Sequence, residues 1–109
     1  MSDDLMDRIR QDIENNDIVL YMKGTGTAPQ CGFSGMVVEV LRRIGVSFKD
    51  IDVLRDPALR EAVKKFADWP TIPQLYIRGE FIGGCDIVRE MYASGELLEV
   101  LKSKGIIKD

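Results

Sequence analysis

The strongest constraint on the fold is an uninterrupted apolar run at residues 18–22, which leads through a glycine-rich loop into a helical pattern at 36–44. A strand that is apolar at every position is covered on both faces, as in the interior of an α/β sheet. The helical pattern ends at Gly45, a natural C-terminal stop, and a second strand pattern follows at 46–53. Strand, helix and strand form a βαβ unit, so we expect these two strands to be parallel with a right-handed crossover.

The remaining segments place this unit in a mixed sheet. Asp56-Pro57 is a strong helix start, because the carboxylate caps the helix and proline suits its first position. Arg78-Gly79 predicts a hairpin turn. The expected elements are helices at 3–15, 36–44, 57–67, 87–92 and 97–104, and strands at 18–22, 46–53, 74–77 and 80–82. This order predicts an α/β fold of the thioredoxin-like kind, in which helices flank a four-stranded mixed sheet.

Apolar positions one turn apart predict which side chains the helices bury. In the helix at 36–44 these are Met36, Val37, Val40, Leu41 and Ile44. In the helix at 57–67 they are Leu59, Ala62, Val63 and Phe66. Phe48 and Ile51 would anchor the second strand. With 109 residues, of which 45% are apolar, the chain is expected to form one domain, 1–109, with an ordinary core.

Charge and hydropathy argue against several classes of partner. With 15 basic and 18 acidic side chains the formal charge is −3, which gives no electrostatic reason to expect nucleic acid or an anionic membrane as a partner. No apolar run reaches the length of a transmembrane helix. The acidic N-terminus lacks a secretory or transit pattern, so we expect a cytoplasmic protein; a presequence removed from the chain would instead indicate the mitochondrial matrix.

Cys31 lies in the glycine-rich loop, where the strand at 18–22 is followed by the helix at 36–44. Free N–H groups and the positive end of the helix dipole favour a thiolate there, and Lys23 would add to this effect. A thiolate is the nucleophile and the metal ligand, so Cys31 is the candidate reactive residue. The alternative is a small buried cysteine that only packs. The flanking Pro, Gln, Gly and Ser residues favour the open loop.

The chain contains no histidine, which removes Ser-His and Cys-His catalysis and every His-ligated metal site. Its two cysteines, Cys31 and Cys85, lie far apart in the sequence. Neither belongs to a C-x-x-C pair, because Ser34 stands where a thioredoxin-like motif has its second cysteine. A zinc site is disfavoured, since one chain does not offer four protein ligands.

Three motifs then carry a family resemblance. They are Lys23-Gly24 followed by Cys31-Gly-Phe-Ser34, then Trp69-Pro-Thr-Ile-Pro-Gln-Leu75, then Gly83-Gly-Cys-Asp86. In this order the chain resembles the monothiol glutaredoxins of the C-G-F-S type over residues 5–103, which implies the glutaredoxin version of the thioredoxin-like fold. Two features depart from the family pattern. Gly26 stands where relatives usually have proline, which predicts a more mobile loop, and no thioredoxin-like domain precedes the module, as in the single-domain form.

The resemblance implies a glutathione site and an iron–sulfur site. Cys31 would bind glutathione or a 2Fe-2S cluster, while Lys23 and Arg60 would hold the glycine carboxylate of glutathione. A solvated helix charge is the alternative for Arg60, but its place in a first helical turn, where a cation is mildly unfavourable, favours function. The implied glutathione-binding residues are Lys23, Cys31, Phe33, Arg60, Ile72, Pro73, Gly84, Cys85 and Asp86.

Two backbone features complete the implied site. Ile72-Pro73 resembles the cis-proline turn of the family, whose exposed backbone at Ile72 would pair with the extended tripeptide like an added strand. A simple strand-initiating proline is the alternative. Gly84 and Asp86 would belong to a helix N-terminus that binds the γ-glutamyl group, or would form only a turn and a cap.

Three side chains keep two interpretations each. Cys85 is either a second redox thiol that pairs with Cys31 in oxidised protein or a small residue that lines the peptide groove. Phe33 would contact the cluster or a partner protein. Trp69 is expected to pack rather than to contact the ligand.

The number of thiols in the chain is compatible with two functions. A reductase would use a monothiol route, in which Cys31 attacks a glutathionylated target and a second glutathione restores it. A carrier of a 2Fe-2S cluster needs four soft ligands, which Cys31 from two chains and two glutathione molecules would supply. The resemblance also implies this glutathione-bridged homodimer, and its open site suits transfer to apo iron–sulfur proteins. We therefore expect a cluster carrier; the alternatives are the reductase and an adaptor that pairs with BolA-type partners.

Overall fold

The computed structural model describes residues 2–108, with side chains from residue 4 onward. Within these residues five α-helices and four strands follow one another in the predicted order, with one short 3-10 helix, η1, before the third α-helix. The helices are α1 (Ser2–Asn15), α2 (Gly32–Ile44), α3 (Pro57–Ala67), α4 (Cys85–Ser94) and α5 (Glu96–Ser103), and η1 is Val53–Arg55. The strands are β1 (Ile18–Met22), β2 (Lys49–Asp52), β3 (Gln74–Ile77) and β4 (Glu80–Gly83).

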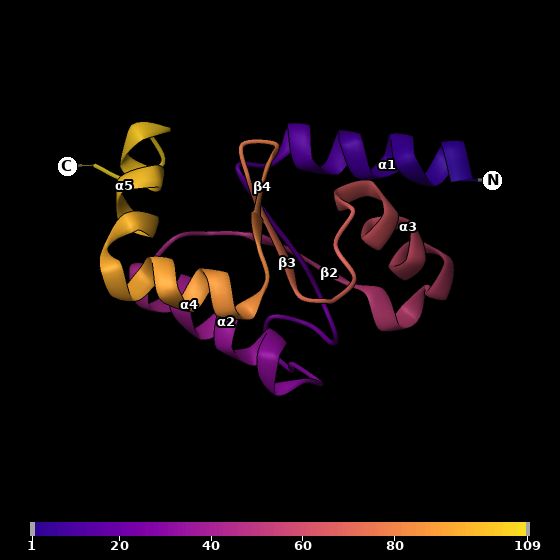
Figure 1. Ribbon diagram of the computed structural model, residues 1–109, viewed down its shortest axis with the longest axis horizontal. Coiled ribbons are helices and arrows are strands. Elements are labelled where there is room, and N and C mark those ends of the chain that lie inside the picture. The colour runs from indigo at the N-terminus through magenta and orange to yellow at the C-terminus, as the bar shows by residue number, and fades with distance from the viewer. Residues whose placement is uncertain (1, 109) are drawn as a thin grey trace.

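The four strands form one mixed sheet in the order β2-β1-β3-β4 (Figure 1). β1 runs parallel to β2, from Val19 beside Lys49 to Met22 beside Asp52, and antiparallel to β3. β3 and β4 form the predicted hairpin. Every residue of β1 is buried, as expected for a strand that is covered on both faces. The thioredoxin-like sheet predicted from the sequence is therefore confirmed.

Helices cover both faces of this sheet (Figure 1). α2, α4 and α5 bury one apolar cluster, while α1 and α3 pack together over the other. Leu75 and Ile77 belong to the first cluster and Tyr76 to the second, because successive side chains of a strand point to opposite faces. The loop that leaves β1 and the loop that enters β3 meet at the same end of the sheet, since these strands are antiparallel neighbours.

The helix boundaries follow their local signals. The Asp56 side chain caps α3 by accepting a hydrogen bond from the Leu59 N–H at 3.1 Å, and Pro57 occupies the first helical position. Gly45 ends α2 with φ +88°, in the left-handed region that glycine adopts without strain. Among the described residues, no helix has both the length and the apolarity that crossing a membrane requires.

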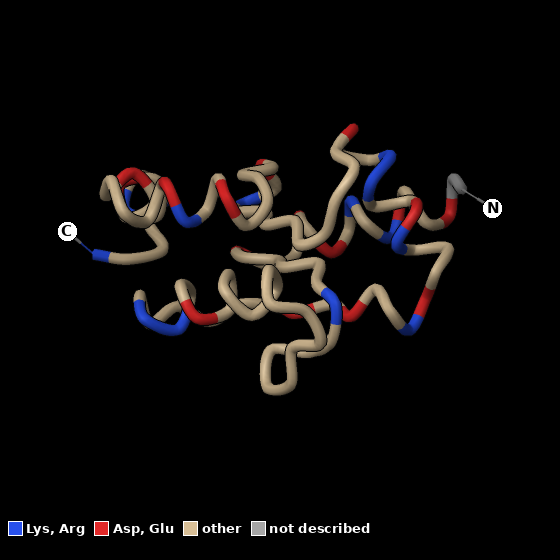
Figure 2. Tube along the Cα trace, turned by 60° about the horizontal axis from the view of Figure 1, so that its bottom comes forward, with Lys and Arg blue, Asp and Glu red and all other residues tan. Residues whose placement is uncertain are grey.

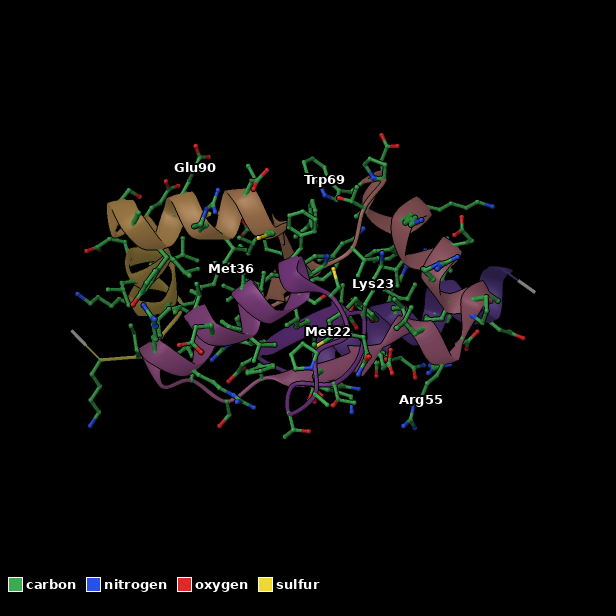
Figure 3. All side chains as sticks on the ribbon, turned by 90° about the horizontal axis from the view of Figure 1, so that it is seen from below. Met22, Lys23, Met36, Arg55, Trp69 and Glu90 are labelled. Atoms are coloured by element: carbon green, nitrogen blue, oxygen red, sulfur yellow. The ribbon has the colours of Figure 1, made fainter. Side chains whose placement is uncertain are left out.

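The predicted burial of α2 was partly wrong. The helix begins at Gly32 rather than at 36, and Met36 (Figure 3) is 38% exposed, whereas Ser34 is fully buried. Met36 instead lines the cavity that contains Cys31, so it faces solvent rather than the core. Ile44 and Phe66 pack on the core clusters but are only partly buried.

The second strand is shorter than its predicted range of 46–53. Only Lys49–Asp52 pairs with β1. The Asp52 side chain accepts a hydrogen bond from the Leu54 N–H at 2.9 Å, which turns the chain into η1. α4, predicted at 87–92, is longer at both ends.

Basic and acidic residues are interspersed along the helices (Figure 2). Many lie within one turn of an opposite charge, as Arg43 does with Glu39 at 3.0 Å and Arg10 with Asp7 at 2.8 Å. Such exposed pairs add little stability because water screens them.

Candidate functional site

Cys31 is the N-cap residue of α2. Its backbone is extended, with φ −150° and ψ 135°, and its carbonyl accepts a helical hydrogen bond from the Gly35 N–H at 2.9 Å. The thiol is free and partly exposed. This position places the sulfur beside the unpaired N–H groups of the first helical turn, as the sequence predicted.

The pKa of the Cys31 thiol lies below its ordinary value. The largest cause is the backbone N–H of Ser34; the N–H of Phe33 and the charge of Lys23 act in the same direction, while burial opposes them. The neutral thiol makes no capping hydrogen bond, but a thiolate is a stronger acceptor for these N–H groups. The predicted thiolate-favouring environment is therefore confirmed, and the helix amides contribute more to it than Lys23 does.

The loop before Cys31 is compact because Gly24 permits a close turn. Gly24 has φ +90°, and a Cβ atom there would lie 2.6 Å from both the Ala28 oxygen and the Gln30 nitrogen. The Gln30 N–H donates to the Lys23 carbonyl at 2.9 Å and closes the loop. The shape that presents Cys31 therefore depends on glycine at this position.

Gly26, where a more mobile loop was expected, is bonded at both of its backbone groups. Its N–H donates to Asp50 Oδ2 and its carbonyl accepts from Arg42 Nη2, each at 2.7 Å. The Gly24 N–H likewise donates to Asp52 Oδ1 at 3.0 Å. The structure thus ties down the residue for which the sequence predicted freedom, because a glycine N–H can make a bond that proline cannot.

Ser34 replaces the second cysteine of a dithiol motif and has a structural role. It is fully buried, and its hydroxyl accepts a hydrogen bond from the Lys23 N–H at 3.1 Å. This bond links the first turn of α2 to the end of β1. The motif therefore contains one thiol and one buried hydroxyl, and this hydroxyl also helps to lower the pKa of Cys31.

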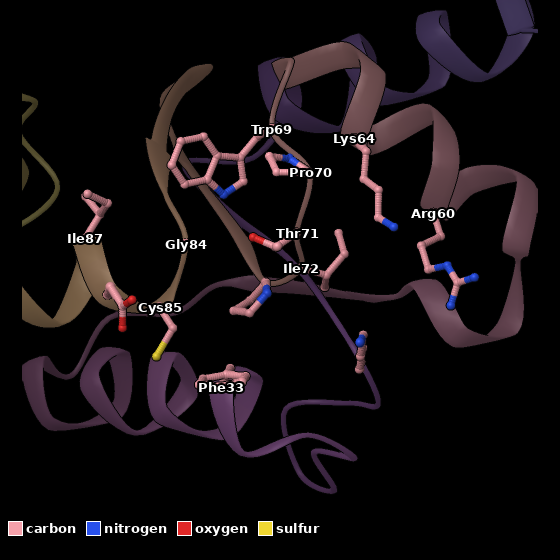
Figure 4. A pocket seen from close by; sticks show the side chains of 13 residues that line it. Phe33, Arg60, Lys64, Trp69, Pro70, Thr71, Ile72, Gly84, Cys85 and Ile87 are labelled. Carbon is pink, nitrogen blue, oxygen red and sulfur yellow. The ribbon is translucent and has the colours of Figure 1, made fainter.

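A cleft of about 390 Å³ opens between α3, the loop before β3 and the start of α4 (Figure 4). It is lined by Lys23, Phe33, Arg60, Lys64, Trp69, Pro70, Thr71, Ile72, Pro73, Gly84, Cys85, Asp86 and Ile87. Eight of the nine residues predicted to bind glutathione are in this lining. The ninth, Cys31, lines an adjoining cavity of about 340 Å³ that shares Phe33, Cys85 and Asp86 with the cleft. The structure thus brings all nine predicted residues together.

Three basic side chains line the cleft: Arg60 and Lys64 from α3, and Lys23 from the end of β1. The Arg60 Nε atom is buried without a hydrogen-bond partner among the described residues, and a Glu61 carboxylate oxygen lies 3.6 Å from it. A buried N–H without a partner is costly, which favours an anionic ligand over a merely solvated charge at Arg60. Lys64 was not among the predicted residues, although its i+4 spacing from Arg60 places both on one helix face.

The loop at residues 69–73 forms another wall of the cleft. Its Ile72-Pro73 peptide bond is cis, as the resemblance implied. The backbone N–H and carbonyl of Ile72 make no hydrogen bond within the described chain, which leaves them for an extended ligand. Trp69 packs against Phe81, with ring centroids 5.7 Å apart, and it also lines the cleft.

The N-terminus of α4 closes the remaining side. Gly84 is its N-cap residue, followed by Cys85 and by Asp86, whose exposed carboxylate lies 3.7 Å from Arg89 Nη2. The pKa of Cys85 is raised, mainly by burial and then by the charge of Asp86, while Arg89 opposes this. The cleft therefore combines cations at α3 with an open helix N-terminus at α4.

A family model described as Glutaredoxin matches residues 18–82 of this chain, more than half of its length. The chain is also 60% identical to probable monothiol glutaredoxin 2 of Rickettsia conorii over 95 residues, which are 87% of this chain and 89% of the relative. The chain belongs to the monothiol glutaredoxins. Glutaredoxin 4 of Haemophilus ducreyi is 50% identical to it over 97 residues, 89% of this chain and 91% of that protein.

Solved structures agree with this assignment. A monomeric truncated mutant of Trypanosoma brucei 1-C-Grx1 superposes on this glutaredoxin with a TM-score of 0.86 at 42% identity, covering 94% of this chain and 93% of the other. Reduced apo GrxS14 of poplar superposes with a TM-score of 0.81 at 44% identity, covering 91% of each chain. A buckwheat glutaredoxin solved with glutathione shares 24% identity and the same fold, with a TM-score of 0.86 over 98% of this chain and 96% of its own.

Proposed function

We propose that this glutaredoxin binds glutathione in the cleft beside Cys31. Glutathione is an extended tripeptide with a carboxylate at its glycine end and both a carboxylate and an amine at its γ-glutamyl end. The cleft offers Lys23, Arg60 and Lys64 to the glycine carboxylate, and the N–H groups of α4 with the Asp86 carboxylate to the γ-glutamyl group (Figure 4). This complementary chemistry at the two sides of one cleft, with an activated thiol beside it, carries the proposal.

We further propose that a 2Fe-2S cluster is the cargo of this protein. Cys31 is the only cysteine of its motif, and among the described residues there is no group of three or more Cys, His, Asp or Glu side chains placed to hold a metal ion. Cys31 from each of two chains and the thiols of two glutathione molecules would supply four sulfur ligands. The protein would carry the cluster as a glutathione-bridged homodimer and pass it to apo iron–sulfur proteins.

Exposed apolar side chains beside Cys31 support such pairing. Among the described residues the large apolar side chains that are exposed are Phe33, Met36 and Leu54. Phe33, at 64% exposure, and Met36 line the same cavity as Cys31. An exposed apolar patch next to a ligand sulfur fits contact with another chain. In the carrier that chain is a second copy, and in the adaptor alternative it is a BolA-type protein.

A second candidate function, favoured by the lowered pKa of Cys31, is the reduction of glutathionylated proteins. The Cys31 thiolate would attack the glutathione sulfur of the mixed disulfide, form a disulfide with that glutathione and release the target thiolate, which takes up a proton. A second glutathione thiolate would attack the new disulfide, freeing Cys31 and leaving oxidised glutathione. Both functions require free thiols, and we propose the reducing cytoplasm as their compartment.

Anaerobic reconstitution with iron, sulfide and glutathione tests the carrier function. We expect a brown protein that elutes as a dimer and shows no visible absorption when glutathione is omitted. Cys31→Ser should remain colourless while keeping the far-UV circular dichroism of the wild type. Colour in Cys31→Ser, or a cluster-loaded monomer free of glutathione, would contradict the proposal. Rapid turnover of a glutathionylated substrate by a protein that stays colourless would favour the reductase.

Two neighbouring lysines of α3 provide a matched control for the glutathione site. Lys64 lines the cleft, whereas Lys65 is exposed outside its lining. Lys64→Ala should weaken glutathione binding and shorten the lifetime of the cluster, because a charge-assisted contact is lost. Lys65→Ala changes the net charge equally and should behave like the wild type. Equal effects in titration calorimetry would show that only long-range charge matters and would count against the proposed contact.

A further inference from the structure

The loop at residues 69–73, which forms one wall of the cleft, is tied to the sheet through a buried amide. Gln74, the first residue of β3, is fully buried, and among the described residues the other buried polar side chain is Ser34. Burying an amide is costly unless its hydrogen-bonding groups are paired. The hydrogen-bond partners of Gln74 therefore indicate its structural role.

Gln74 joins the loop to a tyrosine of the same strand. Its Nε2 donates to the carbonyl oxygens of Trp69 and Thr71, each at 3.2 Å, and its Oε1 accepts from the Tyr76 hydroxyl at 3.2 Å. Two carbonyls can accept only from the NH₂ group, so the amide has one orientation, which Tyr76 fixes from the other side. Gln74 and Tyr76 are two residues apart in β3, so both side chains lie on the face covered by α1 and α3.

These bonds are the side-chain ties of the loop. Within the described chain no other side chain donates to a carbonyl group of residues 69–73. Trp69 is joined to α3 by its own N–H, 3.0 Å from the Lys64 carbonyl. All five residues of the loop line the cleft (Figure 4). The place of this wall consequently depends on a chain of hydrogen bonds that starts in the core.

We propose that Gln74 and Tyr76 are positioning residues for the ligand cleft, Tyr76 by orienting the Gln74 amide and Gln74 by holding the loop at residues 69–73. Neither residue lines the cleft, so both act through the loop alone. The identity of the ligand rests on the proposed glutathione function. The tie itself rests on contacts within this chain.

Tyr21 offers a matched control for Tyr76. Both tyrosines are buried on neighbouring strands, with their rings edge to face and their centroids 5.8 Å apart. The Tyr21 hydroxyl is buried without a hydrogen-bond partner among the described residues, whereas the Tyr76 hydroxyl donates to Gln74. Burial raises the pKa of both phenols, that of Tyr76 to about 12, so both remain protonated at neutral pH. Removing either hydroxyl deletes one oxygen from the same region of the core, but only one deletion breaks the tie.

The test compares Tyr76→Phe with Tyr21→Phe in the full chain. Trp69 is the only tryptophan of the sequence, so its fluorescence reports on the wall of the cleft. Tyr76→Phe should raise acrylamide quenching of Trp69 and weaken glutathione binding about three- to tenfold, the loss expected for one hydrogen bond. Tyr21→Phe should leave quenching and affinity at wild-type values, and its melting temperature should not fall, because the lost hydroxyl was unpaired.

Gln74→Met supplies a second variant, which removes all three bonds while keeping a side chain of similar size. Gln74→Met should raise the quenching of Trp69 and weaken glutathione binding by more than Tyr76→Phe does. Both quantities are measured well below the melting temperature, so that lost stability does not contribute. The proposal is overturned if Tyr76→Phe matches Tyr21→Phe, or if quenching changes while affinity does not. If Gln74→Met does not fold, the tyrosine pair decides the question. If the wild type does not bind glutathione, the proposed function is wrong. The quenching of Trp69 in Tyr76→Phe and Tyr21→Phe still tests whether Gln74 and Tyr76 hold the loop.

Discussion

Two helix N-termini of this glutaredoxin each carry a cysteine, and they affect the thiol in opposite ways. Cys31 is the N-cap residue of α2 and has a pKa below the ordinary value, whereas Cys85 is the first residue of α4 and has a pKa above it. Both are free thiols that line the same cavity. A helix N-terminus alone therefore does not activate a thiol.

The position within the first turn explains the difference. From the N-cap, a side chain can reach the N–H groups of the second and third helical residues, which here are Phe33 and Ser34. No backbone N–H lowers the pKa of Cys85, and the neighbouring charge of Asp86 adds to the effect of its burial. At Cys31 the backbone N–H groups lower the pKa by more than burial raises it. A shift of one residue along a helix start thus separates a thiol of lowered pKa from one of raised pKa.

The largest expected effect is the difference in alkylation rate between the two sulfurs. Cys85→Ser leaves only Cys31 to react with iodoacetamide, and Cys31→Ser leaves only Cys85. Because the thiolate alone reacts, we expect Cys31 to be alkylated at least about tenfold faster near neutral pH. As pH rises, the alkylation rate of Cys31 should increase over a pH range below the ordinary thiol pKa. The alkylation rate of Cys85 should increase over a pH range above it. The extent of alkylation is measured by mass spectrometry. If the two thiols had the same pH profile, the expected difference between the two helix N-termini would be wrong.

A moderate effect is expected when the Cys31 loop loses one of its two side-chain ties to β2. Asp50→Ala removes the acceptor of the Gly26 N–H and should lower the free energy of unfolding by about 1–2 kcal/mol, as for a hydrogen bond to a charged group. The alkylation profile of Cys31 should change, whereas that of Cys85 should not. Lys49→Ala, an exposed neighbour on β2, is the control and should cost under about 0.5 kcal/mol. Equal losses in urea denaturation would show that the tie contributes nothing.

The smallest effect should come from the α4 side. Asp86→Asn removes a like charge beside Cys85, so the pKa of this thiol should fall and its alkylation at neutral pH should become about two- to threefold faster. The change is limited because burial, the larger cause, persists. The rate is measured in the Cys31→Ser background, with Glu90→Gln as the control of equal charge further along α4. A rate that does not respond to Asp86→Asn would assign the raised pKa to burial alone.

Much of the site was predictable because its parts are short motifs. Cys31 lies at the predicted junction of strand and helix, although α2 begins earlier than predicted, at Gly32. The cis bond at Ile72-Pro73 agrees with what the family resemblance implied, and Gly84 begins α4 as that motif implied. Lys64 was missed because it lies outside the three motifs of the resemblance, although its i+4 spacing from Arg60 places both on one face of α3. Met36 was assigned to the core by its helical period, but it lines the cavity beside Cys31 and is exposed.

The sequence by itself determined the order of helices and strands, the cysteine whose pKa is lowered and the lack of a second thiol in its motif, because these depend on residue identity and local backbone preference. Only the tertiary structure decided which carboxylates hold the Cys31 loop, which lysine lines the cleft and how Tyr76 reaches the cleft wall through Gln74. Those contacts depend on the register of neighbouring strands and on the docking of α3, which are set by the simultaneous burial of both sheet faces.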